Sequence, residues 1–322
     1  MREIVIKENE EGQRVDRFLK KYLNKSSLSF LYKMIRKKNI KVNNKRVEKN
    51  YILSKDDKIQ LYLSEDTIEK FMEKKEIFHL KRDFKIVYED DNILIVSKPD
   101  NLLIHEDKSE SKNTLVNQVL SYLHEKGDYN PDSEKTFVPA CVNRLDRNTS
   151  GLVIIAKKYE SLKNLNVMMR NKDSIEKYYI TIVKGSIVGK KELKGYLVKN
   201  ERNNKTTFTN KKVNGAKEIH TKYSVIRTNK NYSLVQVKLI TGRSHQIRLH
   251  LSSNNTPIIG DRKYGDKKIN EEFNKKYKLK NQFLHAYKIG VTHTVGSLKY
   301  LEGKEFIGEL PSKLKKIEKS LF

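Results

Sequence analysis

The stretch VNRLDRNTSGLVIIAK, residues 142–157, places one carboxylate, Asp146, between two arginines and just ahead of a run of strand-forming aliphatic residues. FVPACV before Asp146 and GLVIIAKK after it are each typical of a strand, so we expect RLDRNTSG to be the loop that joins them. A loop held by two strands is a common place for a reactive side chain. A structural ion pair at a strand end and a positioned catalytic carboxylate are both compatible with this pattern.

Asp146 is flanked by Arg144 and Arg147, whose charges favour the ionised form of the carboxyl. An ionised aspartate can act as a nucleophile, a base or a metal ligand. Hard divalent cations usually recruit several carboxylates or carbonyls, and no second acid accompanies Asp146 in this stretch. We therefore expect no metal at this position.

A second cluster of polar residues follows a predicted strand in LITGRSHQIRLHLSSNNTPIIGDRKYG, residues 239–265. His245 and His250 are five residues apart, whereas a zinc pair on one helix face is spaced by four, so this cluster does not predict a metal site. If QIRLH is extended, Arg248 points to the same side as His250. Arg248 is then a candidate partner for a phosphate or for a carboxylate such as Asp146, and a buried arginine that stabilises the fold is the alternative.

Composition limits the partners and the setting of the chain. Its 322 residues allow one large domain and one small one. Lys and Arg number 67 against 40 Asp and Glu, a formal net charge of +27, which makes nucleic acid the first partner to consider. The chain has no apolar run near the roughly 18 residues of a membrane-spanning helix, and it starts without a signal-peptide pattern. The single cysteine, Cys141, excludes internal disulfides, so we expect a cytoplasmic protein without membrane association.

The basic residues are concentrated near the N-terminus. Between Arg14 and Lys58 there are fifteen Lys and Arg against four Asp and Glu. SFLYKMIRKKN predicts an amphipathic helix with a cationic outer face, and IKVNNKRV and KIQLYL predict short strands after it. Like charges in one run repel each other unless an anion lies across them. We therefore expect this unit to contact an anionic partner through Arg36, Lys37, Lys38, Lys41, Lys45 and Arg46.

The rest of the chain predicts a linker over residues 64–80, partly helical, and a larger unit over residues 81–322. KIVYE and ILIVSK predict two strands, TLVNQVLSYLHEKG predicts a helix, and YYITIVKG, SLVQVKLITG, PIIGD and LHAYKIGV predict further strands. A mixed α+β fold with a largely antiparallel sheet fits this order better than a βαβ repeat. The final LPSKLKKIEKSLF is either a helix or a basic tail.

These motifs carry two family resemblances. VDRFLKKYL, SSLSFLYKMIRKKNIKVNNKRV and SKDDKIQLYL resemble the S4 RNA-binding module, over about residues 13–63. NRLDRNTSGL resembles the HRLD-x-x-TSGL signature of the RluA/RluC/RluD family of pseudouridine synthases. VSKPDNLLIH, KYYITIVKG, LITGRSHQIRLH with GDRKYG, and FLHAYKIGVTH are similar to further motifs of that family. Asn143, Asn101 and Ser244 stand where the family has His, Gly and Thr.

The resemblance implies an S4-like RNA-binding domain over residues 1–63, whose cations named above would bind RNA, followed by a pseudouridine synthase domain. It looks closest to the RluC type, which modifies uridines of large-subunit (23S) ribosomal RNA. The implied partner is that RNA or a pre-ribosomal particle, and the implied reaction is the isomerisation of uridine to pseudouridine after base flipping. No metal or organic cofactor is implied, and nothing in the chain demands more than a monomer. The alternative is a non-catalytic S4-containing RNA-binding or ribosome-assembly protein that keeps the fold.

The resemblance also implies roles for single residues. Asp146 would be the catalytic aspartate that attacks the target uridine, Tyr179 would stack on the base and move a proton, and Arg248 would pair with Asp146. Arg144 would fill the gap that the flipped nucleotide leaves. The other expected substrate-binding residues are Arg147, Arg243, Ile247 and Leu284, the last two packing around the base.

Overall fold

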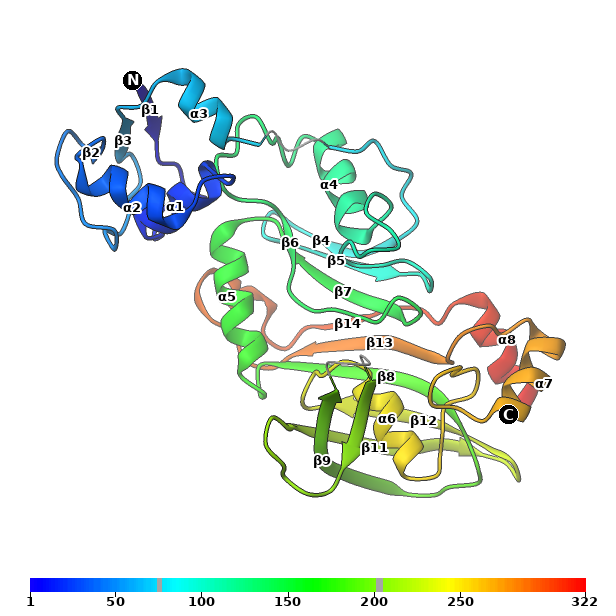
Figure 1. Ribbon diagram of the computed structural model, residues 1–322. Helices are drawn as coiled ribbons and strands as arrows, with labels where there is room; N and C mark the ends of the chain where they lie inside the picture. The colour runs from blue at the N-terminus through cyan, green and yellow to red at the C-terminus, as the bar shows by residue number, and fades with distance from the viewer. Residues whose placement is uncertain (74–76, 201–204) are drawn as a thin grey trace.

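The structure, a computed structural model, describes residues 1–73, 77–200 and 205–322. Its N-terminal unit has a three-stranded antiparallel sheet in the order β1-β3-β2. Figure 1 shows this sheet and its helices in blue and cyan at the N-terminal end of the chain. They bury one hydrophobic core that extends from Ile4 to Ile68. The elements of this unit are β1 (Arg2–Val5), α1 (Val15–Tyr22), α2 (Leu28–Arg36), β2 (Ile40–Val42), β3 (Lys58–Leu61) and α3 (Glu65–Phe71).

Helix α2 is amphipathic, as the sequence predicts. Its N-cap residue Ser27 accepts a hydrogen bond from the backbone N–H of Phe30 at 3.1 Å, which satisfies a donor of the first turn. The helix buries Leu31, Met34 and Ile35 in the N-terminal core. The cations that follow these apolar residues in sequence remain on the outside.

Helix α3 lies within the predicted linker and buries Ile68 in the N-terminal core. Residues 74–76 of that linker lie outside the described residues. The N-terminal unit also touches the larger one through Asn9, which donates to Glu134 Oε1 at 2.9 Å and accepts from the backbone N–H of Tyr159 at 3.1 Å. The domain boundaries drawn from the sequence stay a prediction.

The larger unit is built on one sheet with the strand order β10-β9-β11-β12-β8-β13-β7-β5-β4, to which β14 adds beside β13 and β6 beside β7. Its neighbouring strands are antiparallel except β13 and β7, which run parallel. The predicted α+β fold with a mixed, largely antiparallel sheet is confirmed. The strands are β4 (Lys85–Glu89), β5 (Ile93–Lys98), β6 (Ala140–Cys141), β7 (Ser150–Ala156), β8 (Ile175–Lys184), β9 (Lys190–Asn200), β10 (Lys205–Thr209), β11 (Lys217–Thr228), β12 (Tyr232–Leu239), β13 (Leu284–Val291) and β14 (Glu305–Ile307).

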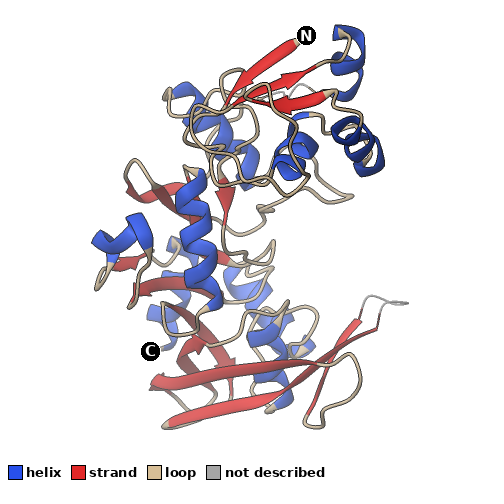
Figure 2. Ribbon diagram, turned by 90° about the vertical axis from the view of Figure 1, so that its left-hand side faces the viewer, coloured by secondary structure: helices blue, strands red, loops and turns tan. Residues whose placement is uncertain are grey.

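Helices cover both faces of the middle of this sheet, and β7 is therefore buried on both sides. Alternate residues of β7 enter two different cores, because successive side chains of a strand point to opposite faces. Leu152 and Ile154 pack with α5 and η1, whereas Val153 and Ile155 share a core with α4 and α8. In Figure 2 the N-terminal unit lies above this sheet-based part. The helices of the larger unit are α4 (Leu115–Glu125), α5 (Tyr159–Arg170), α6 (Gln246–Ser253), α7 (Lys267–Tyr277), η1 (Gly296–Leu301) and α8 (Ser312–Leu321).

Three strand expectations were wrong. QIRLH is not extended but opens helix α6, because His245 takes a left-handed backbone (φ 56°) that turns the chain, and residues 246–251 are all buried, so no exposed face reveals the helical period. PIIGD forms only an isolated bridge between Ile258 and Val183 before Gly260 turns the chain. In FVPACV only the two residues of β6 pair with β7. The C-terminal segment, left open between helix and tail, is helix α8.

None of the helices in the described part of the chain has both the length and the hydropathy to span a bilayer.

Candidate active site

A buried lysine, Lys98, holds the loop that carries Asp146 in place. Lys98 is 1% exposed, and its ammonium donates to the carbonyl oxygens of Pro99 and Leu102 at 2.8 Å and of Arg147 at 3.0 Å. These three bonds use all three donors of an ammonium group. Burial lowers the pKa of Lys98 to about 7, against the opposing charges of Asp100 and Asp146. Lys98 thus ties the residue next to Asp146 to the end of strand β5.

The far end of the loop is fixed to strand β13. Gln282 Nε2 donates to Thr149 Oγ1 at 3.1 Å, and the Ser150 hydroxyl lies 2.8 Å from His285 Nδ1. Gly151 then enters β7 with φ +122°, and a Cβ built there would lie 2.3 Å from the carbonyl oxygen of Ala286. Glycine is therefore required where β7 and β13 make their parallel pairing.

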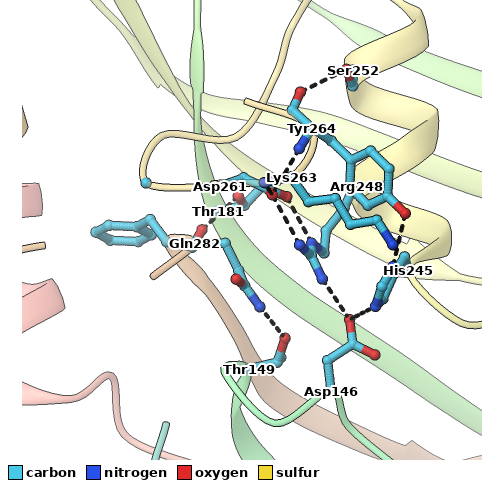
Figure 3. Close-up of polar contacts among 12 residues, drawn as sticks. Asp146, Thr149, Thr181, His245, Arg248, Ser252, Asp261, Lys263, Tyr264 and Gln282 are labelled. Carbon is cyan, nitrogen blue, oxygen red and sulfur yellow. Dashed lines mark hydrogen bonds and ion pairs between the residues drawn. The ribbon is translucent and has the colours of Figure 1, made fainter. Parts of the chain in front are cut away.

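Asp146 and Arg248 meet across the site, as the sequence predicts. Arg248 Nη1 donates to Asp146 Oδ2 at 3.2 Å. The same guanidinium binds a second carboxylate, with Nε and Nη2 donating to the two oxygens of Asp261 at 2.7 and 2.9 Å (Figure 3). This bidentate pair fixes the plane of the guanidinium and leaves one edge of it for Asp146.

Asp261 is the buried anchor of this arrangement, with 1% exposure against 28% for the side chain of Asp146. Burial alone would raise the pKa of Asp261, but the hydrogen bonds and charge of Arg248 and the backbone N–H groups of Lys263 and Tyr264 bring it below its ordinary value. Asp261 is thus a permanent anion that holds Arg248 in place.

His245 and Tyr264 form the other wall beside Asp146. His245 Nε2 lies 3.8 Å from Asp146 Oδ2, and its Nδ1 lies 2.9 Å from the Tyr264 hydroxyl. Burial lowers the pKa of His245, against the charge of Asp146. The Tyr264 ring also lies under the Arg248 guanidinium, with 5.1 Å between the guanidinium carbon and the ring centre.

Tyr179 lies on strand β8 and is 6% exposed. Burial, and then the charge of Asp146, raise the pKa of its phenol well above the ordinary value. The phenol is therefore neutral near pH 7, when it can stack and donate a hydrogen bond but is a poor base.

Asp146 lines a cavity of about 100 Å³. It brings together seven of the eight residues that the sequence predicted for catalysis and substrate binding, namely Asp146, Tyr179, Arg248, Arg144, Arg243, Ile247 and Leu284. Arg147 does not line it, since its guanidinium points outward and donates to Ser109 Oγ at 3.1 Å.

The ion pairs of Asp146 differ from the sequence-based interpretation. Among the described residues its partners within 4.0 Å are Arg248 and His245, and neither flanking arginine is one of them. The reason is that successive side chains in a loop without regular structure point in different directions. Closeness in sequence therefore does not place Arg144 or Arg147 at the carboxylate.

The predicted RNA-binding cations of the N-terminal unit all reach solvent. Lys41 is half-buried, with its ammonium 5.1 Å from the centre of the Tyr62 ring, and the other five are exposed. Of the six, Arg46 has an ion pair, a 4.0 Å contact with Glu48, and the remaining five have none with any residue that the structure describes. The outer surface of α2 and the turn after β2 thus carry unneutralised positive charge.

Sequence reasoning missed Asp261, Lys98, His245 and Gln282 as members of the site. Asp261 and Lys98 lie inside motifs that the sequence had singled out, GDRKYG and VSKP, but the motifs alone do not say which side chain meets which. In the described ranges no group of three or more His, Cys, Asp or Glu side chains is arranged to hold a metal ion.

The fold and the site define an RNA-acting enzyme, with an S4 domain ahead of a mixed sheet that presents an arginine-bound aspartate in a cavity. A sequence model described as RNA pseudouridylate synthase matches residues 92–253, and an S4 domain model matches residues 13–59. An uncharacterized RNA pseudouridine synthase of Mycoplasma capricolum is 37% identical over 95% of this chain and 97% of its own. The chain belongs to the RNA pseudouridylate synthase family.

Other relatives agree with this assignment. The proteins named ribosomal large subunit pseudouridine synthase C from Vibrio vulnificus and Buchnera aphidicola are 32% and 33% identical over 89% of this chain, and 87% and 88% of their own lengths. The solved structure of human RNA pseudouridylate synthase domain containing 4 shares the fold, with a TM-score of 0.57 and 21% identity over 73% of this chain and 92% of that one.

Proposed function

We propose that this enzyme isomerises uridines of large-subunit ribosomal RNA, with Asp146 as the attacking carboxylate. The observation that carries the proposal is the bond from Arg248 to Asp146 in a cavity, with Arg248 itself locked by the buried Asp261. A guanidinium that is already oriented holds the carboxylate in one direction. An ionised, oriented and partly exposed aspartate is what a nucleophilic role needs.

The reaction moves one bond and one proton. Asp146 attacks the target nucleotide and forms a bond to it, the N1–C1′ bond of uridine breaks, the uracil ring turns, and a C5–C1′ bond forms in its place. The bond to Asp146 breaks again before the product leaves, which restores the free carboxylate. The proton on C5 then leaves and N1 gains one, so the product has the same atoms as the substrate. No oxidant, reductant or co-substrate is consumed.

The walls of the cavity suit a flipped base. Uridine in stacked RNA hides its reacting atoms, so the nucleotide must swing out into the site. Tyr179 offers a neutral aromatic face for stacking, and Ile247 and Leu284 offer apolar sides. Arg144 lies exposed at the rim, where it can take the space that the nucleotide leaves.

The S4 domain supplies the second part of the function. Its free cations on α2 and after β2 suit phosphates, which fix position without reading sequence, while the cavity reads the base. The names of the Vibrio and Buchnera relatives support large-subunit ribosomal RNA as the partner. We propose that the enzyme binds this RNA free or in a pre-ribosomal particle. A monomer working in the cytoplasm fits this role.

Release of tritium from uridine labelled at C5 tests the proposal, because the C5 hydrogen is lost only when the new carbon–carbon bond forms. Purified protein is incubated with a labelled, protein-free transcript of large-subunit ribosomal RNA, and with a small-subunit transcript as the control. We expect stoichiometric release from a few uridines of the large-subunit transcript alone. Release from both transcripts alike, or from the small-subunit transcript only, contradicts the proposed substrate.

A further inference from the structure

A second, larger cavity adjoins the catalytic one. It has a volume of about 520 Å³ and extends from the catalytic cavity toward the end of α5 and the start of β8. The two cavities share part of their lining, namely Arg144, Tyr179, Leu239, Gly242 and Arg243. Anything that occupies the larger cavity is therefore in direct reach of a nucleotide in the smaller one.

Among the described residues, this second cavity is lined by cations and by no Asp or Glu. Its charged residues are Arg144, Arg170, Lys172, Lys177 and Arg243, and none of them has an ion pair within the part of the chain that the structure describes. Some lysines elsewhere on the molecule are matched by a carboxylate, as Lys238 is by Glu176. Five unmatched cations around one hollow repel each other, and an anion in the hollow relieves that repulsion.

Among the five cations, Lys177 gives the strongest support for an anion in this cavity. It lies two residues before Tyr179 on β8, and alternate residues of a strand face the same side of a sheet, so the two side chains share the face of the active site. Burial lowers the pKa of Lys177, and no acceptor in the described chain receives a hydrogen bond from its ammonium. A half-buried cation without a partner is costly to the free protein, and a phosphate would remove that cost.

We infer that this cavity binds the backbone phosphates next to the flipped uridine, with Lys177, Arg170 and Lys172 as the phosphate-binding residues. The inference rests on the proposed function, since it takes RNA as the ligand. When the target nucleotide enters the catalytic cavity, its neighbouring phosphates must lie close to the shared lining, and the cationic cavity begins there. The phosphates then hold the backbone while the base is isolated in the catalytic cavity.

The salt dependence of binding tests this inference. Affinity of the full chain for a protein-free large-subunit rRNA transcript is measured at several salt concentrations for the wild type, for Lys177→Gln, and for the triple variant Arg170→Gln/Lys172→Gln/Lys177→Gln. Each lost contact to a single-stranded phosphate should lower the slope of log K against log salt by about 0.7, so the triple variant should lose about 2. Lys177→Arg, which keeps the charge, should retain the slope and shows that the loss is not misfolding.

Lys190→Gln is the matched control. Lys190 lines a hollow with Tyr178 and Lys238, on the sheet face opposite to Tyr179, so this variant removes the same charge far from the proposed contacts. Two results would overturn the inference. One is an unchanged salt slope in the triple variant, and the other is a loss of slope in Lys190→Gln as large as that in Lys177→Gln. These binding data do not depend on turnover, so they decide it even if the transcript is not isomerised. If it is, the triple variant should raise KM for the transcript.

Discussion

At the scale of single residues, the site depends on one guanidinium shared by two carboxylates of unequal exposure. Arg248 was predicted as a partner of Asp146 on the assumption of a strand, and the contact exists although the segment is helical. The shared guanidinium also makes the buried Asp261 a positioning residue rather than a catalytic one. Its pairing with Arg248 could not be predicted from the sequence, because it depends on how the chain folds back between them.

Asp261→Asn tests this positioning role. The amide cannot accept two charge-assisted bonds from Arg248, so the guanidinium loses its fixed plane and Asp146 its orientation. We expect kcat to fall by at least about 10-fold, for a loss of about 1.4 kcal/mol in transition-state stabilisation, with little change in KM for RNA. Asp266→Asn, at the half-buried N-cap of α7, is the control and should leave kcat unaltered. An Asp261→Asn enzyme with wild-type kcat would exclude the role.

His285 makes the stability of the protein depend on pH. It is 0% exposed between Ser150 and Gly308, and burial lowers its pKa to about 4 from the ordinary 6.5. Below pH 6.5 the unfolded chain takes up a proton that the native protein refuses, so the free energy of unfolding falls as the pH drops toward 4.

Between pH 7.5 and pH 4.5 this histidine alone should account for about 2 kcal/mol of lost stability. Urea unfolding of the wild type and of His285→Gln at the two pH values measures it, since the variant lacks the titration and should lose less on acidification. His293→Gln, at an exposed position, should behave as the wild type does. Equal pH dependence of His285→Gln and wild type would refute this account.

At the scale of elements, the parallel contact of β7 with β13 positions the catalytic loop, and Gly151 permits it. The Cβ of Gly151→Ala would meet Ala286 backbone atoms that cannot move aside. We therefore expect the free energy of unfolding to fall by about 3 kcal/mol or more, and the activity to be lost as well. Gly189→Ala also changes a glycine of positive φ, +77°, but into open space, and should cost only about 1 kcal/mol. Thermal unfolding of both variants makes the comparison, and similar costs would remove the special role of Gly151.

The elements show where sequence reasoning succeeds. KIVYE and ILIVSK were predicted with their exact bounds, and GLVIIAKK within two residues of β7, because apolar runs bounded by turn residues leave few alternatives. Helix α6 was missed because every residue from 246 to 251 is buried, so tertiary packing rather than amphipathic period decides its form. The strand predicted in FVPACV was too long, because only the two residues of β6 pair with another strand and the other residues of the stretch do not.

At the scale of the whole molecule, two groups of cations stand out, one on the S4 domain and one in the cavity beside the active site. The sequence showed the cations of the S4 domain because they follow one another in the chain. The cationic cavity beside the active site could not be seen that way, because Arg144, Lys177 and Arg243 come from separate segments that only the large sheet brings together. The two groups of cations belong to different parts of one RNA-binding surface in this account.

In the proposed function, the enzyme isomerises uridines of large-subunit ribosomal RNA through attack by Asp146. The most direct measurement maps pseudouridine in that RNA, by carbodiimide-dependent reverse-transcription stops, in cells that have this protein, lack it, or carry only Asp146→Asn. We predict discrete stops in the first cells that are absent from both others, while purified Asp146→Asn still binds the transcript. Stops that persist in the Asp146→Asn cells, or in the cells that lack the protein, would contradict the account.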